Sequence, residues 1–93
     1  MVYRLEPHID LTFTALSHPT RRAILRRLAF GALSVGDLAL PFHMSLQAIS
    51  KHLRILEKAR LITRKKAGRA RIIALNRVPL QEALVWIEDF QAS

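Results

Sequence analysis

Apolar and polar positions alternate along the 93-residue chain in patterns that predict mostly helices. The clearest case is SLQAISKHLRI, which starts at Ser45. At helical spacing, its apolar side contains Ile49, Leu53 and Leu56. Its other side gathers polar and basic residues, namely Gln47, Lys51, Arg54 and Lys58. The pattern predicts a helix over 45–58 that buries one side and presents a charged side to a partner.

Caps and breakers set the bounds of three shorter helices before this one. They are expected from about Leu5 or His8 to Leu16, from Pro19 to Gly31, and from Ser34 to Leu40. Pro19 suits a first helical position because its missing N–H would have no partner there. Ser34 is a typical cap and Pro41 stops the third helix. The connection between the third helix and the helix over 45–58 is therefore tight.

After these helices the pattern changes to an extended one. The stretch LITRKKAGRARIIAL, which starts at Leu61, is rich in isoleucine and predicts a hairpin that turns at Ala67 and Gly68. After Pro79, LQEALVWIEDF predicts a last helix with a broad apolar side. The expected fold class is mainly α with a small β-hairpin: four helices, two strands and a fifth helix. No repeat or linker divides the chain, so we expect one domain over residues 1–93.

The apolar sides of the first and last helices predict a homodimer. A chain of this size buries a limited share of its surface and often needs a partner. The expected contacts are Ile9, Phe13, Leu80, Leu84, Ile87 and Phe90. The alternative is that both helices complete the core of a monomer, with Trp86 as a packed anchor.

The net charge of +8 is confined to one segment. Residues 45–71 contain nine of the 15 basic residues and one of the seven acidic residues. Charge concentrated in this way favours contact with a polyanion, although a solvated surface is the alternative. A tight pair of helices followed by a basic hairpin is a winged helix-turn-helix, which predicts double-stranded DNA as the partner. Gln47 would pair with adenine, Lys51 and Arg54 with guanine or phosphate, and Ser50 with base edges or phosphate.

From Ala15 to Asn76 the chain resembles the ArsR/SmtB family of bacterial winged-helix repressors. The resemblance is carried by ALSHPTRRAIL, LSVGDLA, SLQAISKHLRILEKARL and the GR of the hairpin, or wing. It implies a dimeric repressor that binds an inverted repeat, with Gln47, Ser50 and Lys51 as contacts of the DNA-reading helix and Arg69 at the wing tip. The full set of expected DNA contacts is Ser45, Gln47, Ser50, Lys51, Arg54, Lys66, Arg69 and Arg71.

The chain departs from the metal-sensing members of that family. Ser34, Val35 and Gly36 stand where those members have Cys-Val-Cys, and the chain has no cysteine. The last helix has no histidine, and the four histidines of the chain are scattered. We therefore expect no metal and no cofactor. His52 is expected to support the packing of its helix rather than to read bases.

Arginine residues raise two further questions. Arg60 occupies the family's usual glycine, so either the helix ends with another geometry or the charge compensates for the strain. The second helix carries Arg21, Arg22, Arg26 and Arg27. One or two of these four would touch phosphate, or those near the helix end would favour the helix dipole.

The predicted function is sequence-specific regulation of transcription, most simply by a cytoplasmic repressor without a membrane segment. Its effector would be an unknown small molecule or protein. One alternative is a winged helix that binds proteins through its terminal helices, and another is non-specific packaging of nucleic acid. Enzyme function is not expected, because the serine, histidine and acidic residues form no recognisable catalytic pattern.

Overall fold

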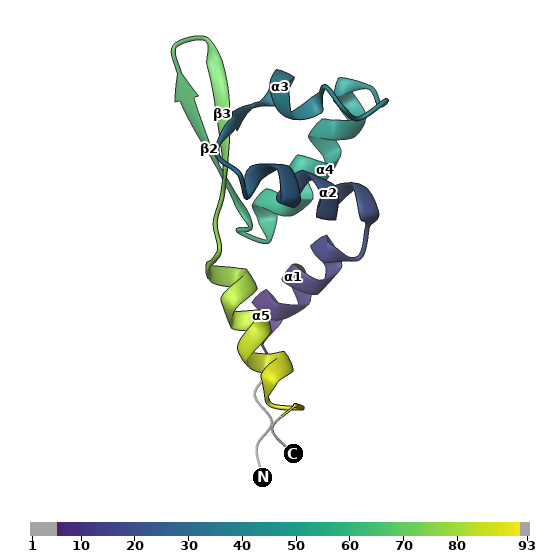
Figure 1. Cartoon of the computed structure of the whole chain (residues 1–93), viewed down its shortest axis with the longest axis vertical. Helices are drawn as coiled ribbons and strands as arrows, with labels where there is room; N and C mark the ends of the chain where they lie inside the picture. The colour runs from purple at the N-terminus through teal and green to yellow at the C-terminus, as the bar shows by residue number, and fades with distance from the viewer. Residues whose placement is uncertain (1–5, 92–93) are drawn as a thin grey trace.

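The computed structural model describes residues 6–91 as a winged helix-turn-helix (Figure 1). Its elements are α1 (Pro7–Leu16), α2 (Pro19–Leu28), β1 (Leu33–Ser34), α3 (Val35–Ala39), α4 (Leu46–Lys58), β2 (Ile62–Ala67), β3 (Ala70–Leu75) and α5 (Val78–Glu88). The expected fold class and order of helices are confirmed. The earlier of the two expected starts of the first helix, Leu5, lies outside the described residues.

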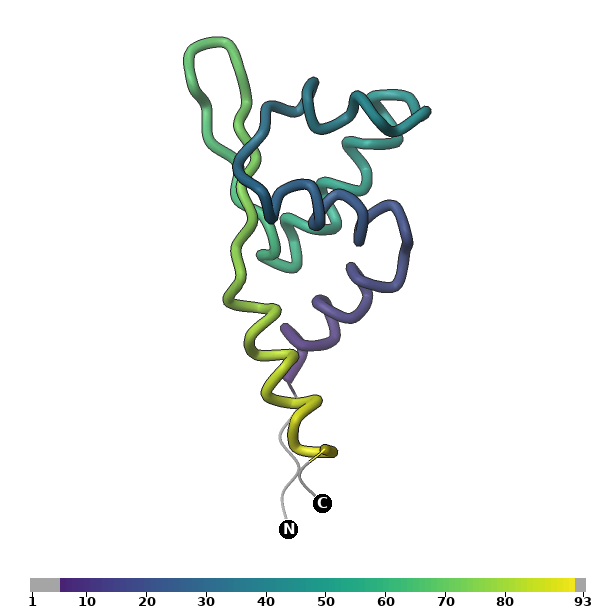
Figure 2. Tube along the Cα trace, viewed as in Figure 1, coloured from purple at the N-terminus to yellow at the C-terminus, as the bar shows by residue number. Residues whose placement is uncertain are grey.

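The elements form two parts along the longest axis of the molecule (Figure 2). At one end α1 packs against α5, and the wing formed by β2 and β3 projects from the other end. The remaining helices, α2, α3 and α4, lie between these two ends. Among the described helices, none has the length and hydropathy needed to span a bilayer.

The core is built around the apolar side of α4. Ile49, Leu53 and Leu56 are all 0% exposed, as their spacing predicted. The other fully buried large side chains around them come from α2, α3 and the sheet, namely Ile24, Leu38, Leu61 and Ile73. Each buried side chain of this size contributes roughly 1.5–3 kcal/mol to the free energy of unfolding. Turning another side of α4 into the core would therefore cost much of the stability.

The sheet has one strand more than the sequence indicated. β1 pairs antiparallel with β3 through Leu33 with Ile73 and Ser34 with Ile72, so the order is β1-β3-β2. A strand of two residues is too short to show alternation, which is why the sequence predicted only a hairpin. Ser34 then caps α3 by accepting the Asp37 N–H at 3.1 Å.

Arg60 keeps the backbone geometry of the glycine it replaces. Its φ is +60°, in the left-handed region. The Leu61 N–H donates to the Leu56 carbonyl at 3.0 Å, and the Arg60 N–H donates to the Glu57 carbonyl at 2.9 Å. These two bonds form a Schellman motif at the end of α4. Of the two alternatives, a different geometry is therefore excluded, and the strain of a side chain in this conformation remains.

Relief of this strain is testable by comparing Arg60→Gly with Arg60→Ala. We expect Arg60→Gly to raise the free energy of unfolding by about 0.5–1 kcal/mol, because glycine adopts positive φ without a steric cost. Arg60→Ala removes the same charge but keeps Cβ, so it should bring no such gain. Urea denaturation at one protein concentration measures both. An equal gain in the two variants would show that the charge, not the backbone, is the cost.

Candidate nucleic-acid interface

The exposed side of α4 carries most of the residues expected to read bases. Ser45 begins the helix by accepting the Ala48 N–H at 3.1 Å, which uses one lone pair of a hydroxyl that stays exposed. Gln47, Lys51 and Arg54 are exposed, and Ser50 is half-buried beside them. Because the opposite side of α4 is in the core, these side chains face outward as one surface.

The wing adds a second basic surface. The turn between β2 and β3 is made by Gly68, whose φ is +61°. Lys66 and Arg71 are cross-strand partners next to this turn, and Arg69 lies in it. All three side chains are exposed, as expected for contacts with a phosphate backbone.

Arg64 behaves differently from the other basic residues of the wing. It is half-buried, and its Nε lies 3.4 Å from Glu57 Oε2 in the last turn of α4. The ion pair neutralises the charge of Glu57, the one acidic residue of segment 45–71, and joins the wing to α4. Arg64 is therefore a link between the two basic surfaces rather than a free contact for phosphate.

Arg21 lies in a buried network that the sequence did not indicate. It is 8% exposed. Its Nε donates to the Ala15 carbonyl at 2.8 Å, one Nη donates to the Thr14 carbonyl at 3.1 Å, and the other lies 3.2 Å from His52 Nδ1. Burial therefore excludes Arg21 from the one or two arginines of α2 that were expected to touch phosphate. Its spacing from Ile24, Leu25 and Leu28 put it on the buried side of α2, and that signal was available in the sequence.

The other arginines of α2 also contact the protein itself. Arg22 donates to the Leu16 carbonyl at 2.8 Å, and Arg27 donates to the Asp37 carbonyl at 3.1 Å. Arg26, by contrast, is exposed and makes no hydrogen bond to another element among the described residues. The hydrogen bonds of Arg22 and Arg27 therefore join α2 to the end of α1 and to α3.

His52 joins α4 to the start of α2. Its ring centroid is 4.6 Å from that of His18, and His18 Nδ1 caps α2 by accepting the Thr20 N–H at 3.1 Å. Burial lowers the pKa of His52, and the neighbouring His18 and the Arg21 guanidinium lower it further. A neutral ring is what the geometry requires, because Nδ1 must be free to accept from Arg21.

The residues expected at a dimer contact divide into two groups. Ile9 is 9% exposed and Leu80 packs against the core, so both are used largely within the protomer. Phe13 is half-buried and meets Trp86 edge-on, with ring centroids 5.8 Å apart. The side chains that stay exposed are Leu84 at 52%, Ile87 at 38% and Phe90 at 68%.

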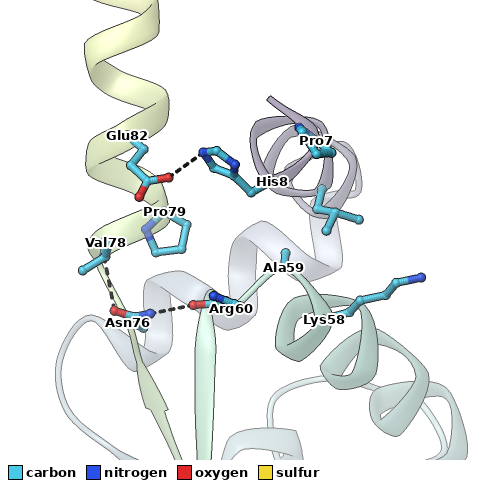
Figure 3. Close-up of a pocket in the computed structure, with 10 residues that line it drawn as sticks. Pro7, His8, Lys58, Ala59, Arg60, Asn76, Val78, Pro79 and Glu82 are labelled. Carbon is cyan, nitrogen blue, oxygen red and sulfur yellow. Dashed lines mark hydrogen bonds and ion pairs between the residues drawn. The ribbon is translucent and has the colours of Figure 1, made fainter. Parts of the chain in front are cut away.

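A cavity of about 670 Å³ lies where α1, α5 and the end of α4 meet (Figure 3). His8 and Glu82 join α1 to α5 across it, with Nε2 and Oε2 3.1 Å apart. Asn76 joins its other side, donating to the Arg60 carbonyl at 2.8 Å and accepting the Val78 N–H at 3.3 Å. Lys58 from the last turn of α4 also lines the cavity, so a ligand in the cavity would contact α4 directly.

Within residues 6–91, no three histidine, cysteine or acidic side chains are grouped closely enough to hold a metal ion.

The structure places the expected DNA contacts on two exposed surfaces joined by the Glu57–Arg64 pair. An α-helix fits the major groove of DNA, and α4 carries hydrogen-bonding and cationic side chains. Basic side chains of the wing flank this helix.

Comparison with known proteins finds relatives that are all transcriptional regulators. Residues 16–65 match a family model described as a helix-turn-helix domain. The transcriptional repressor SdpR of Bacillus subtilis is 40% identical over 78 residues, covering 84% of this chain and 87% of that protein. The HTH-type transcriptional regulator Rv2034 of Mycobacterium tuberculosis is 45% identical over 67 residues, covering 72% of this chain and 63% of that protein.

Solved structures agree with these relatives. The crystal structure of an ArsR family transcriptional regulator has a TM-score of 0.89 and 36% identity, and the match covers 97% of this chain and 93% of that one. An ArsR-like transcriptional regulator from Rhodococcus sp. RHA1 has a TM-score of 0.82 and 31% identity over 92% of this chain and 81% of that one.

The lowered pKa of His52 predicts a stability that falls in mild acid. The unfolded histidine takes up a proton near pH 6.5, whereas the folded one does so only at lower pH. Stability is therefore full above pH 6.5 and is lost as the pH falls through the folded pKa. Urea denaturation across this range measures the loss.

His52→Asn should reduce that loss, because the amide oxygen can accept from Arg21 without titrating. His43→Asn is the matched control, since His43 is exposed in the connection between α3 and α4. Its pH dependence should equal that of the parent protein. The same acid loss in His52→Asn and in the parent would rule out His52 as the titrating group.

Proposed function

Because the chain belongs to the ArsR/SmtB family of winged helix-turn-helix transcriptional regulators, we propose that it is a dimeric repressor that binds an inverted-repeat operator. Members of this family regulate transcription and are not enzymes. The observation that carries the proposal is the exposed basic and amide side of α4 beside an exposed basic wing. Occupation of a promoter by such a dimer would block transcription.

The two surfaces have different tasks in this proposal. Side chains of α4 enter the major groove, where Gln47 pairs with adenine and Lys51 and Arg54 pair with guanine or phosphate. Ser45 and Ser50 donate to base edges or phosphate near the start of the helix. The wing residues Lys66, Arg69 and Arg71 hold the phosphate backbone and contribute affinity without sequence preference.

The dimer would form through α1 and α5. Leu84 and Ile87 on α5 and Phe90 just after it are exposed apolar side chains that a partner could cover. Pairing of this surface across a two-fold axis would place the two α4 helices in successive major grooves. Half-site centres would then lie about 10–10.5 base pairs apart, or a multiple of that.

Release from DNA would not depend on the usual metal sites of the family. The chain has no cysteine to supply a thiolate, and the last helix carries no histidine. The cavity beside Lys58 supports a small-molecule effector instead, because a ligand there would contact α1, α4 and α5 together. The protein would act in the cytoplasm, where its DNA is.

The proposal is tested by fluorescence anisotropy on a duplex selected from a random pool and on a scrambled duplex. Lys51→Ala and Arg54→Ala should each weaken binding to the selected duplex by about 1–3 kcal/mol, with less change on the scrambled one. Arg69→Ala should weaken both alike and lower the salt slope by about 1.8, because the dimer loses one phosphate contact in each half-site. Gln81→Ala, an exposed change on α5, is the control and should change neither.

Equal losses on both duplexes for Lys51→Ala and Arg54→Ala would contradict base reading by α4. A selection that yields no preferred sequence, with steeply salt-sensitive binding, would favour non-specific packaging. Failure to bind DNA even at low salt would favour a protein-interaction module.

The dimer is tested by Leu84→Asp, which places a charge on the exposed apolar surface of α5. We expect sedimentation to show a monomer at concentrations where the parent is a dimer, and operator binding to weaken with it. Leu40→Asp is the matched control, because Leu40 is 76% exposed at the end of α3. A dimer that persists in Leu84→Asp and dissociates in Leu40→Asp would place the interface elsewhere.

A further inference from the structure

The first turn of α4 exposes a leucine that the described part of the fold leaves uncovered. Leu46 is the first residue of the helix and is 60% exposed. Leu53 and Leu56 of the same helix are 0% exposed. A leucine that is 60% exposed keeps most of its apolar surface available to a partner that covers it.

The stability of the helix does not explain Leu46. Helix starts are often fixed by a hydrophobic staple between the residue before the cap and the fourth residue of the helix. Here the cap is Ser45, so those two positions are Met44 and Ile49. The order of residues therefore fits a staple that does not include Leu46.

The position of Leu46 is that of a residue that meets base edges. Helical side chains tilt toward the N-terminus, so Leu46 projects ahead of the end that enters the groove. Ser50 lies one turn later on the same side, and Gln47 is its neighbour along the chain. The polar residues around Leu46 are thus those proposed to contact bases.

One chemical group in the major groove suits an apolar side chain at this position. Adenine, guanine and cytosine present hydrogen-bonding edges there, whereas thymine also presents its C5 methyl group. We propose that Leu46 determines specificity by packing on a thymine methyl next to the base pair that Gln47 contacts. This inference rests on the proposed function, because it requires sequence-specific binding by α4.

The test removes the methyl group without altering hydrogen bonding. Each thymine of the selected operator is replaced in turn by deoxyuridine, in both half-sites, and anisotropy gives the affinity of the parent and of Leu46→Ala. Burying one methyl group corresponds to about fourfold in affinity. We therefore expect one replacement to weaken the parent about fifteenfold over two half-sites, and Leu46→Ala to bind both duplexes equally.

Lys66→Ala is the control variant, because Lys66 is exposed on the wing and away from α4. It should weaken binding overall and keep the full response to deoxyuridine. A parent that tolerates every deoxyuridine, or a Leu46→Ala variant that keeps the parent's response, would overturn the inference while leaving sequence-specific binding intact. If the parent protein showed no preferred DNA sequence, this result would instead contradict the proposed function.

Discussion

Burial of one side of α4 is the constraint on which the rest of the molecule depends. Ile49, Leu53 and Leu56 have no exposed surface, and helices α2 and α3 and the sheet close around them. A helix with one side in the core must present the other side to solvent. The outward position of Lys51 and Arg54 is therefore a consequence of packing, and the DNA-reading surface needs no separate device to form.

The position of the wing relative to α4 follows from contacts at the end of that helix. The Schellman bonds at Arg60 end the helix and turn the chain into β2. The Asn76 side chain holds the Arg60 carbonyl, and the Glu57–Arg64 pair adds an electrostatic link. The pair is partly screened by water, because the Glu57 side chain is 44% exposed, so its contribution is modest. The two basic surfaces are thus joined at the end of α4 by hydrogen bonds and one ion pair.

The middle of α4 is held from the other direction. Arg21 bonds the carbonyls of Thr14 and Ala15 and reaches His52 on α4. This network joins the last turn of α1 to α4 through hydrogen bonds.

Local patterns in the sequence determined the helices, the wing, the basic segment and the buried side of α4, because periodicity, caps and charge depend on neighbouring residues. They did not determine the two-residue strand β1, which forms only because β3 lies beside it. They also did not determine that Arg21 bonds to the end of α1 and to His52, that Arg60 keeps a positive φ, or that Arg64 pairs with Glu57. Tertiary structure decided these features, because each depends on contacts or hydrogen bonds between elements that fold against one another.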